Sequence, residues 1–438
     1  MTLFERIIRA SWPPVLVFIF LALGIFFGER HQASQAFDQD YYHMQVIRQF
    51  ESEWPKPNIS DFTSATGPTY HLVMVVIGKV VGSDLATLRL ASMIFGIGLI
   101  TAVASVSALF IGVRGAALLA MPLATSMYVV ASGIYVHTDN FAWMCAAVVV
   151  GIAAFGRVSV VNLFAAACFA ALAVSIRQSF IWTIGPLIFA GLLASPLGSR
   201  LCRRQTDEEI LEGRWGALAG TLLASIPALV VLGVLISLWG GLIQEKYRLY
   251  HSTEYSLCVF GYGAAVFGLY APFFLIALPN LRELFQRFLS WIITGAIVGG
   301  LAALVAATTP DADAGRTGGP VWLLAGIGPT IADRSVVLTL MAAFGGGALA
   351  LFIGAGFAQG RGYGSLVTFC ALIAIFCTQL VNDQVFQRYF DTPILMVLIW
   401  LTALGIGEQS DAQDRVAIGP PLLAVILAFL LTVRAVGL

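Results

Sequence analysis

Thirteen apolar stretches follow one another along this chain of 438 residues, separated by short polar segments. A helix rises roughly 1.5 Å per residue, so about 20 apolar residues cross a hydrocarbon core of about 30 Å. With 59% hydrophobic and 11% charged residues, the chain carries more apolar surface than one water-soluble core can bury. We therefore expect an all-α, polytopic membrane protein. The predicted spans are residues 12–28, 87–111, 116–132, 140–156, 159–176, 179–195, 216–239, 257–278, 288–307, 335–357, 364–381, 385–406 and 416–436.

Residues 68–82 decide the orientation of every later span. This segment is too short for a full crossing, because its helix would reach only about 22 Å, and it carries His71 and Lys79. We expect it to lie at the membrane interface. The basic loop from Arg200 to Arg214 is then cytoplasmic, as the positive-inside rule requires, whereas a crossing at 68–82 would move that loop outside.

The N-terminus has the pattern of a signal sequence without a cleavage site. Arg6 and Arg9 precede an apolar run from Val15 to Phe27, and no small-residue motif follows that run. The pattern predicts a retained signal anchor with a cytoplasmic N-terminus. Residue 29 onward then lies on the extracytoplasmic face.

The expected topology collects polar segments on that outer face. Within the first outer loop, Tyr42, Val46 and Phe50 keep a four-residue spacing, which predicts a surface helix with one apolar side on the bilayer. A second surface helix is expected to open at Gly67-Pro68. All five histidines fall on the outer face, so we expect any chemistry to be extracytoplasmic. The polar segments are FDQDYYH (37–43), TSATGPTYH (63–71), YVHTDN (135–140), SIRQSF (175–180), QEKYRLYH (244–251) and NDQVFQRYFD (382–391).

Charge and cysteine content disfavour several classes of protein. The 24 basic residues are balanced by 24 acidic ones, so nothing favours binding to nucleic acid. Six cysteines without a CxxC pair do not form a zinc or disulfide framework. An ion-coupled transporter needs ionisable groups at mid-bilayer, whereas the charges here stay at the span ends. A flippase or permease for a lipid-linked sugar is therefore the weaker alternative to an enzyme, because it needs a polar path through the middle of the bilayer.

The order of the outer motifs resembles a known enzyme family. FDQDYYH, a Trp-Pro element at Trp54-Pro55, Leu88-Arg89-Leu90, YVHTDN, IRQSFIW, WGGLIQEKYRLYH and FQRYFD follow one another over residues 30–400. This order is similar to that of the dolichyl-phosphate-glucose-dependent alpha-1,2-glucosyltransferases, which have the GT-C fold. The compact loops suggest a bacterial relative. The resemblance implies a hexosyltransferase, with glucose favoured, that takes its sugar from a polyprenyl phosphate and inverts the anomeric centre.

The resemblance also implies an essential carboxylate in the first outer loop. That role falls on Asp38 or Asp40, and the motif FDQDYYH leaves the choice between them open. An inverting transfer needs one carboxylate as general base and separate cations for the leaving phosphate. The alternative is that one aspartate only caps a helix. No cofactor is required; DQD also resembles a metal-binding DxD motif, so a divalent ion is an alternative, although arginines suffice for one phosphate.

Cations and polar groups of the other outer segments complete the expected site. The candidates for binding the donor phosphate are Arg177, Arg388, Lys246 and Arg248. The candidates for binding acceptor or sugar are His43, His137, Asp139, Gln178, Tyr389 and Gln387. Each has a simpler interpretation: helix capping at 138–139, an arginine reaching toward headgroups at 177, and a solvated charge run at 246–248.

The chain is thus expected to have four parts: a signal anchor (1–28), a first extracytoplasmic loop (29–86), a catalytic transmembrane module (87–256) and a variable C-terminal module (257–438). The expected partners are a polyprenyl-phosphate sugar, a lipid-linked or other glycan acceptor and membrane lipid. A protein or lipid A glycosyltransferase of the same fold is a second alternative. The expected location is a bacterial inner membrane with a periplasmic site, or the endoplasmic reticulum membrane in a eukaryote.

Overall fold

The computed structural model describes residues 2–27, 34–156, 159–198, 215–248, 255–382, 384–407 and 415–436, and these residues are helical almost throughout. The predicted cytoplasmic loop from Arg200 to Arg214 and His251 lie outside the described residues. In chain order, the first half contains α1 (Leu3–Phe27), α2 (Ser34–Asp38), the π-helix η1 (Gln39–His43), α3 (Met44–Ser52), α4 (Thr69–Val81), α5 (Leu85–Thr125), α6 (Met127–Ile134), α7 (Asp139–Phe155), α8 (Val160–Ile176), the 3₁₀ helix η2 (Gln178–Thr183), α9 (Ile184–Ala194) and α11 (Trp215–Trp239).

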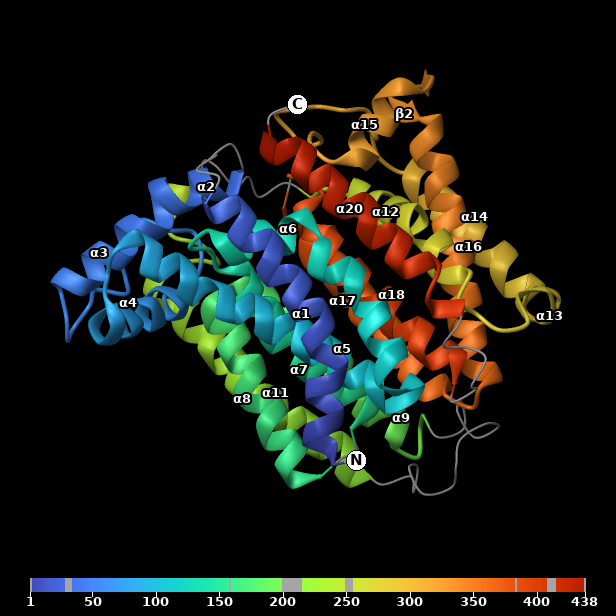
Figure 1. Ribbon diagram of the computed structural model, residues 1–438, viewed down its shortest axis with the longest axis horizontal. Coiled ribbons are helices and arrows are strands. Elements are labelled where there is room, and N and C mark those ends of the chain that lie inside the picture. Colours follow the sequence, from blue (N-terminus) through green and yellow to red (C-terminus); the bar gives the residue numbers. More distant parts are fainter. Residues whose placement is uncertain are drawn as a thin grey trace.

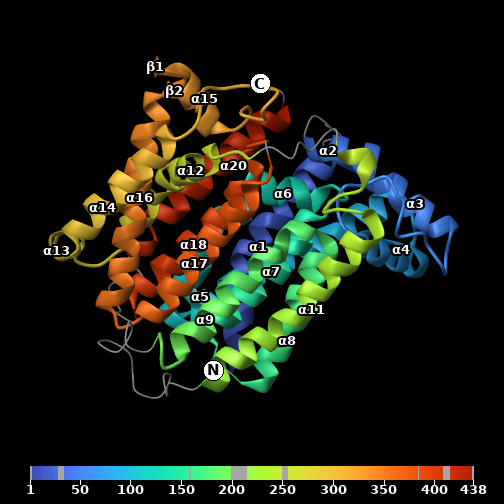
Figure 2. The same cartoon turned by 180° about the vertical axis from the view of Figure 1, so that it is seen from behind.

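The second half contains the 3₁₀ helix η3 (Glu245–Tyr247), α12 (Cys258–Leu275), α13 (Leu281–Arg287), α14 (Leu289–Leu304), α15 (Pro320–Ile327), the strands β1 (Thr330–Ile331) and β2 (Arg334–Ser335), α16 (Val336–Ala358), α17 (Gly362–Gln379), α18 (Arg388–Ile406) and α20 (Gly419–Val436). The long helices lie side by side in one bundle (Figures 1 and 2). The small helices α2, α3 and α4 gather on one side of this bundle, and α13 and α14 lie on the opposite side.

Several helices have the length and composition of membrane spans, so the chain is a multi-pass membrane protein. Among the described residues, seven helices qualify: α1, α5, α11, α12, α16, α17 and α18. Two bent pairs, α6 with α7 (119°) and α13 with α14 (79°), raise the number to nine if each counts as one span. Shorter apolar helices remain at α4, α8, η2–α9 and α20. The expected count of thirteen spans is therefore not confirmed.

Helix α5 contains the predicted span 87–111 and the first part of the predicted span 116–132, whose remainder lies in α6. Its 41 residues would extend for about 60 Å as a straight helix, roughly twice the hydrocarbon thickness. The helix is broken at Gly112, whose φ of 73° suits only a residue without a β-carbon. Phe18 of α1 lies against both Gly96 in α5 and Gly133 in α6. Helix α1 therefore contacts the chain both before and after the break at Gly112.

The first outer loop forms two helices beside the bundle, close to the predicted positions. Helix α4 spans about 20 Å and is too short to cross, in agreement with an interfacial segment. The expectation that α3 lays its apolar side on the bilayer is wrong. Val46 and Phe50 are fully buried in protein, where the ring of Phe50 packs edge-on against Phe62. The amphipathic pattern was real, but its apolar side covers the neighbouring loop and α4 instead of lipid.

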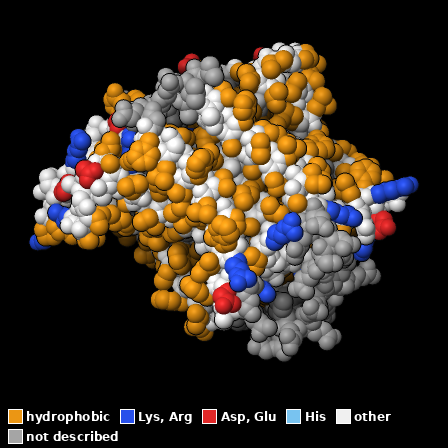
Figure 3. Space-filling model, viewed as in Figure 1, with side chains coloured by type: hydrophobic (Ala, Val, Ile, Leu, Met, Phe, Trp, Pro, Cys, Tyr) orange, Lys and Arg blue, Asp and Glu red, His pale blue; other side chains and the backbone are white. Residues whose placement is uncertain are grey.

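The bundle has its protein core around α18. Every residue of α18 from Phe390 to Ile406 is buried. By contrast, α1 and α11 expose large apolar side chains such as Phe20 and Leu223. Figure 3 shows apolar side chains spread over the middle of one face, with charged side chains at its margins. This outward apolar surface is what contact with lipid requires.

Helices α14 and α16 approach each other through glycines. A β-carbon on Gly295 would lie 2.4 Å from the carbonyl oxygen of Gly346, and one on Gly346 would lie 2.1 Å from that of Gly295. No side chain fits at either position without a shift of the backbone. Small residues allow this close backbone packing, which replaces the hydrophobic effect as a source of helix association in lipid.

Candidate active site

Asp38 lies where the first outer helix changes its winding. It ends α2, and the next five residues form η1, a π-helical turn of the kind often found at functional sites. The side chain of Asp38 makes no capping hydrogen bond, so the interpretation of Asp38 as a helix cap is wrong. Its Oδ2 accepts a hydrogen bond from Nη1 of Arg388 at 2.8 Å and lies 3.4 Å from Nε2 of His137.

Gln39 fixes this turn against the bundle. The buried Gln39 side chain accepts through Oε1 from Nε of Arg89 (2.9 Å) and from the backbone N–H of Val136 (3.2 Å). These bonds tie η1 to α5 and to the segment after α6. Both residues lie in motifs of the family resemblance, but neither was a site candidate. The available signal was an arginine at 89, inside an apolar run that becomes buried in the structure.

The structure separates the two candidate bases. Asp40 is exposed, and its Oδ1 accepts from the Gln39 amide at 2.7 Å. Asp38 instead contacts the distant residues Arg388 and His137. The two carboxylates of the DQD motif therefore bind different partners. Among the described residues, no group of three His, Cys, Asp or Glu side chains is arranged to hold a metal ion.

The bend between α6 and α7 brings two further groups to Asp38. His137 is buried, and its Nδ1 accepts from the backbone N–H of Asp139 at 3.3 Å. Asp139 opens α7, where the helix dipole favours a carboxylate, and its Oδ1 accepts from Nη1 of Arg177. Thr138 makes no capping hydrogen bond through its side chain. The simpler interpretation of Thr138 as a helix cap is therefore wrong.

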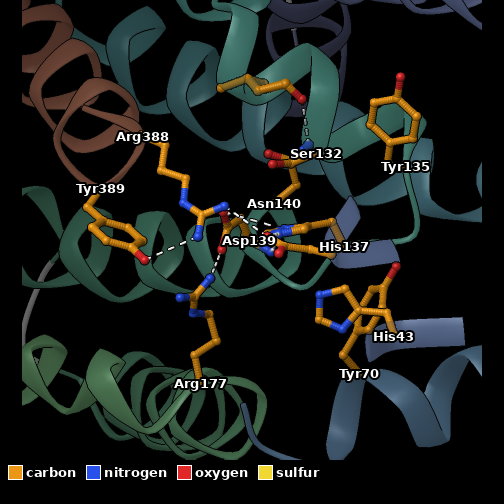
Figure 4. A network of polar contacts seen from close by, with 12 residues as sticks. His43, Tyr70, Ser132, Tyr135, His137, Asp139, Asn140, Arg177, Arg388 and Tyr389 are labelled. Carbon is orange, nitrogen blue, oxygen red and sulfur yellow. Dashed lines mark hydrogen bonds and ion pairs between the residues drawn. The ribbon is translucent and has the colours of Figure 1, made fainter. Parts of the chain in front are cut away.

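Two arginine–carboxylate pairs thus meet in one polar cluster, which Figure 4 shows from close by. We call the residues Asp38, His137, Asp139, Arg177, Arg388 and Tyr389 the outer cluster. Arg388 also donates from Nη2 to the hydroxyl of Tyr389 at 3.2 Å. The side chains of Asp38 and Arg388 keep 21% and 19% of their surface exposed, so a ligand can reach them from outside.

His43 lies behind the outer cluster and not in it. Its ring is buried edge-on to His137, with centroids 5.0 Å apart, on the side away from Arg388 (Figure 4). Nδ1 of His43 is 2.9 Å from Nε2 of the buried His71. His43 therefore supports His137 in this structure, and its predicted role as an acceptor ligand stays a prediction.

Burial and charge set the protonation states around Asp38. Burial raises the pKa of the Asp38 carboxyl, but the hydrogen bond with His137 and the positive charge of Arg388 outweigh it, so this pKa lies well below its usual range. Burial lowers the pKa of His137, and the bond to Asp38 opposes this only in part. Burial and the neighbouring His137 lower the pKa of His43. The cluster therefore holds a carboxylate beside neutral imidazoles.

Four other predicted residues lie outside the outer cluster. Gln178 bridges two loops by donating to the carbonyl oxygens of Ala65 (2.7 Å) and Leu242 (3.0 Å). Lys246 forms an exposed ion pair with Asp61 at 2.5 Å. These contacts hold the loops in place.

Arg248 and Gln387 also have partners in the protein scaffold. Arg248 donates to the carbonyl oxygens of Trp239 and Gly240 at the end of α11, where unpaired carbonyl groups need donors. The buried Gln387 accepts from the backbone N–H of Val321 at 3.1 Å.

A second polar network anchors the start of α18, and of its members only Gln387 was a site candidate from the sequence. Asp391 is buried and accepts from the hydroxyls of Ser126 (2.5 Å) and Tyr270. Gln387 donates to the same Tyr270 hydroxyl at 3.3 Å. These bonds join the first turn of α18 to α6 and α12. The guanidinium of Arg388, one turn away, therefore projects from a fixed helix. The signal in the sequence was an aspartate followed by an unbroken apolar run.

The sequence matches no protein-family model, and no curated protein matches it. The structure is similar to two solved membrane proteins at low identity. One is ArnT from Cupriavidus metallidurans bound to undecaprenyl phosphate, with 13% identity, a TM-score of 0.40 and coverage of 93% of this chain and 78% of ArnT. The other is the archaeal oligosaccharyltransferase AglB from Archaeoglobus fulgidus in complex with an inhibitory peptide and a dolichol-phosphate. It shows 14% identity, a TM-score of 0.46 and coverage of 97% of this chain and 56% of AglB. At this level the likeness assigns no family and no activity.

Proposed function

We propose that this protein is a membrane glycosyltransferase of the GT-C type. It moves a hexose, with glucose favoured, from a polyprenyl-phosphate donor to a lipid-linked glycan or another extracytoplasmic acceptor. The observation that carries the proposal is the contact of Asp38 with Arg388 across 350 positions of sequence, beside the pair of Arg177 with Asp139. Two carboxylates and two arginines thus share a partly open cluster beside apolar, span-length helices.

The outer cluster contains the groups that an inverting transfer needs. The acceptor hydroxyl attacks the anomeric carbon while the bond from that carbon to the phosphate oxygen breaks. Asp38 takes the hydroxyl proton as general base. The leaving phosphate keeps the bonding electrons, and Arg177 and Arg388 neutralise its charge, since a guanidinium fork suits phosphate oxygens. A second carboxylate next to the reacting carbon, which a retaining double displacement needs, is not required.

The location follows from the expected topology. The N-terminal end of α1, with Arg6 and Arg9, is opposite to the end beside α2 (Figure 1), and α2 ends at Asp38 of the outer cluster. If the arginines mark the cytoplasmic side, the cluster faces the periplasm of a bacterial inner membrane.

The decisive experiment is a transfer assay with the purified protein in liposomes. Prenyl-phosphate glucose, mannose and other hexoses carry the radiolabel, and the measurement is label that leaves the lipid for an added glycan or lipid acceptor. We expect Asp38→Asn to lower kcat by roughly 100-fold or more, since a general base contributes on that scale. Asp40→Asn is the matched control and should keep full activity. Full transfer by Asp38→Asn would refute the assignment of the base.

The same assay separates the alternatives. A protein or lipid A glycosyltransferase of this fold would use the same donor with another acceptor, so a screen of peptides, lipid A and lipid-linked glycans identifies it. A flippase or permease would move the labelled lipid between leaflets and leave its sugar–phosphate bond intact. Counterflow without bond cleavage would therefore overturn the enzymatic proposal.

A further inference from the structure

In the proposed reaction Arg388 interacts with both the Asp38 carboxylate and the donor phosphate. The structure shows only its contact with Asp38. Its Nη1 donates to Asp38 at 2.8 Å, and its Nη2 donates to Tyr389. Its Nε is buried and has no hydrogen-bond partner. A guanidinium presents five N–H donors, so this arginine retains a donor edge that a second anion can use.

The contact with Arg388 also holds Asp38 in a form that is a poor base. A carboxylate that accepts from a guanidinium and lies beside an imidazole binds a proton weakly. The general base of the transfer must nevertheless accept the proton of the acceptor hydroxyl. In the arrangement seen here, Oδ2 of Asp38 accepts from Arg388 and faces His137, so a cation already neutralises the carboxylate.

We propose that the donor phosphate takes Arg388 away from Asp38, and that this exchange turns Asp38 into the working base. The inference rests on the proposed function and adds an order of events to it. The lipid-phosphate donor binds first, and the site becomes competent for the acceptor hydroxyl only afterwards. Free enzyme thus keeps its carboxylate paired with a cation until the leaving group is in place.

The exchange requires only the Arg388 side chain to move, while the backbone of α18 stays fixed. The bonds of Asp391 to Ser126 and Tyr270 hold the first turn of α18 in place. The guanidinium itself lies over the rings of Phe386 and Tyr389, at 5.5 and 5.1 Å from their centroids. Aromatic faces hold a cation without fixing its in-plane direction. The head of Arg388 can therefore turn toward a phosphate while its helix stays still.

The other groups that face Asp38 are constant in this exchange. His137 contributes its Nε2 from the bend between α6 and α7. Arg177 after α8 acts on Asp38 through its charge, whereas the neutral, buried ring of His43 in η1 contacts His137. Tyr389 reaches Asp38 only through Arg388. Loss of Arg388 to the donor therefore removes the strongest cation from the carboxylate and raises its proton affinity.

Donor binding must then be linked to proton uptake by Asp38. The probe is a short-chain prenyl-phosphate glucose, whose phosphodiester keeps one negative charge over the whole pH range. We expect its affinity for the wild-type protein to rise as the pH falls toward 4, by up to tenfold per pH unit. We also expect Asp38→Asn to remove this pH dependence and to bind the probe roughly tenfold tighter at pH 7, because the competing anion is gone. Binding is measured by scintillation proximity in detergent.

Two controls keep the outcome decisive. Asp40→Asn should bind like the wild type at every pH, and Asp38→Ala should repeat the gain in affinity if Asp38→Asn folds poorly. Equal or weaker binding by both Asp38 variants, or a pH dependence that survives in them, overturns the exchange and leaves the proposed function standing. Absence of binding by every prenyl-phosphate hexose to the wild type overturns the proposed function itself.

Discussion

The backbone N–H of Asp139 donates to Nδ1 of His137 across 3.3 Å. A neutral imidazole that accepts at Nδ1 carries its proton on Nε2, and this atom lies 3.4 Å from Oδ2 of Asp38. The same Nδ1 lies 3.4 Å from Oδ2 of Asp139, a contact that favours a proton on Nδ1. In the tautomer that the backbone N–H favours, the imidazole orients Asp38 as a hydrogen-bond donor and does not compete with it for the proton of an acceptor.

Replacement of His137 tests this orientation. His137→Ala removes a hydrogen bond to a charged group, so we expect transfer to fall roughly 10- to 100-fold. His137→Gln can still donate from its amide and should lose less. The measurement is the initial rate of hexose transfer at saturating donor. Equal losses in the two variants would contradict a donor role for Nε2.

Stability should depend on pH through the buried histidines. The pKa values of His43, His71 and His137 lie below their ordinary value of 6.5 because all three rings are buried. Below pH 6.5 the unfolded chain therefore binds protons that the folded protein does not. The free energy of unfolding should fall on acidification by up to about 1.4 kcal/mol per pH unit for each histidine, and it should be flat above pH 7.

Asp38 does not contribute in that range. Because its folded pKa is depressed, its stabilising contacts are fully present above its ordinary pKa of 3.8 and are lost only as the pH falls through the depressed value. Thermal unfolding in detergent between pH 5 and 8 measures the slope. The double variant His43→Gln/His137→Gln should reduce the slope without abolishing it, because His71 still titrates, and an unchanged slope would show that other groups are responsible.

The pair of Arg177 with Asp139 is suited to a double-mutant cycle. Both side chains are largely buried, so Arg177→Gln or Asp139→Asn alone leaves an uncompensated charge and should cost about 3 kcal/mol of stability. The double variant should recover part of this loss. For comparison, Lys246→Gln breaks an exposed ion pair and should change stability by less than about 1 kcal/mol. Additive losses in the cycle would mean that the two groups are not coupled.

The glycine contact between α14 and α16 predicts a steric effect. Gly346→Ala places a methyl group 2.1 Å from the carbonyl oxygen of Gly295, so the helices must separate. We expect a loss of about 1–3 kcal/mol, seen as a lower Tm in detergent. Gly233→Ala in α11 is the matched control, because a β-carbon there meets nothing within 4 Å and favours the helix. Equal effects at both positions would argue against the close contact.

Hydropathy predicted the membrane character and most helix positions, because both depend on residues that are neighbours in the chain. The segment 68–82 was correctly expected to be too short to cross, from its length alone. The break at Gly112 and the burial of Val46 and Phe50 were not predictable in this way. They depend on what packs against these residues, and an apolar helix face has the same pattern whether it meets lipid or protein.

The same distinction between sequence and tertiary packing applies to the candidate site. Residue types and motif order were enough to select Asp38, His137, Asp139, Arg177 and Arg388 as polar groups on one face. They could not distinguish Asp38 from Asp40, whose side chains point in different directions because of the η1 turn. They also could not reveal which candidates are held by contacts within the scaffold, namely Gln178, Lys246, Arg248 and Gln387. Composition along the chain determined that this is a helical membrane protein. Only the packing of distant helices decided which charges meet, because two residues hundreds of positions apart, such as Asp38 and Arg388, can lie in contact or far apart with the same local sequence.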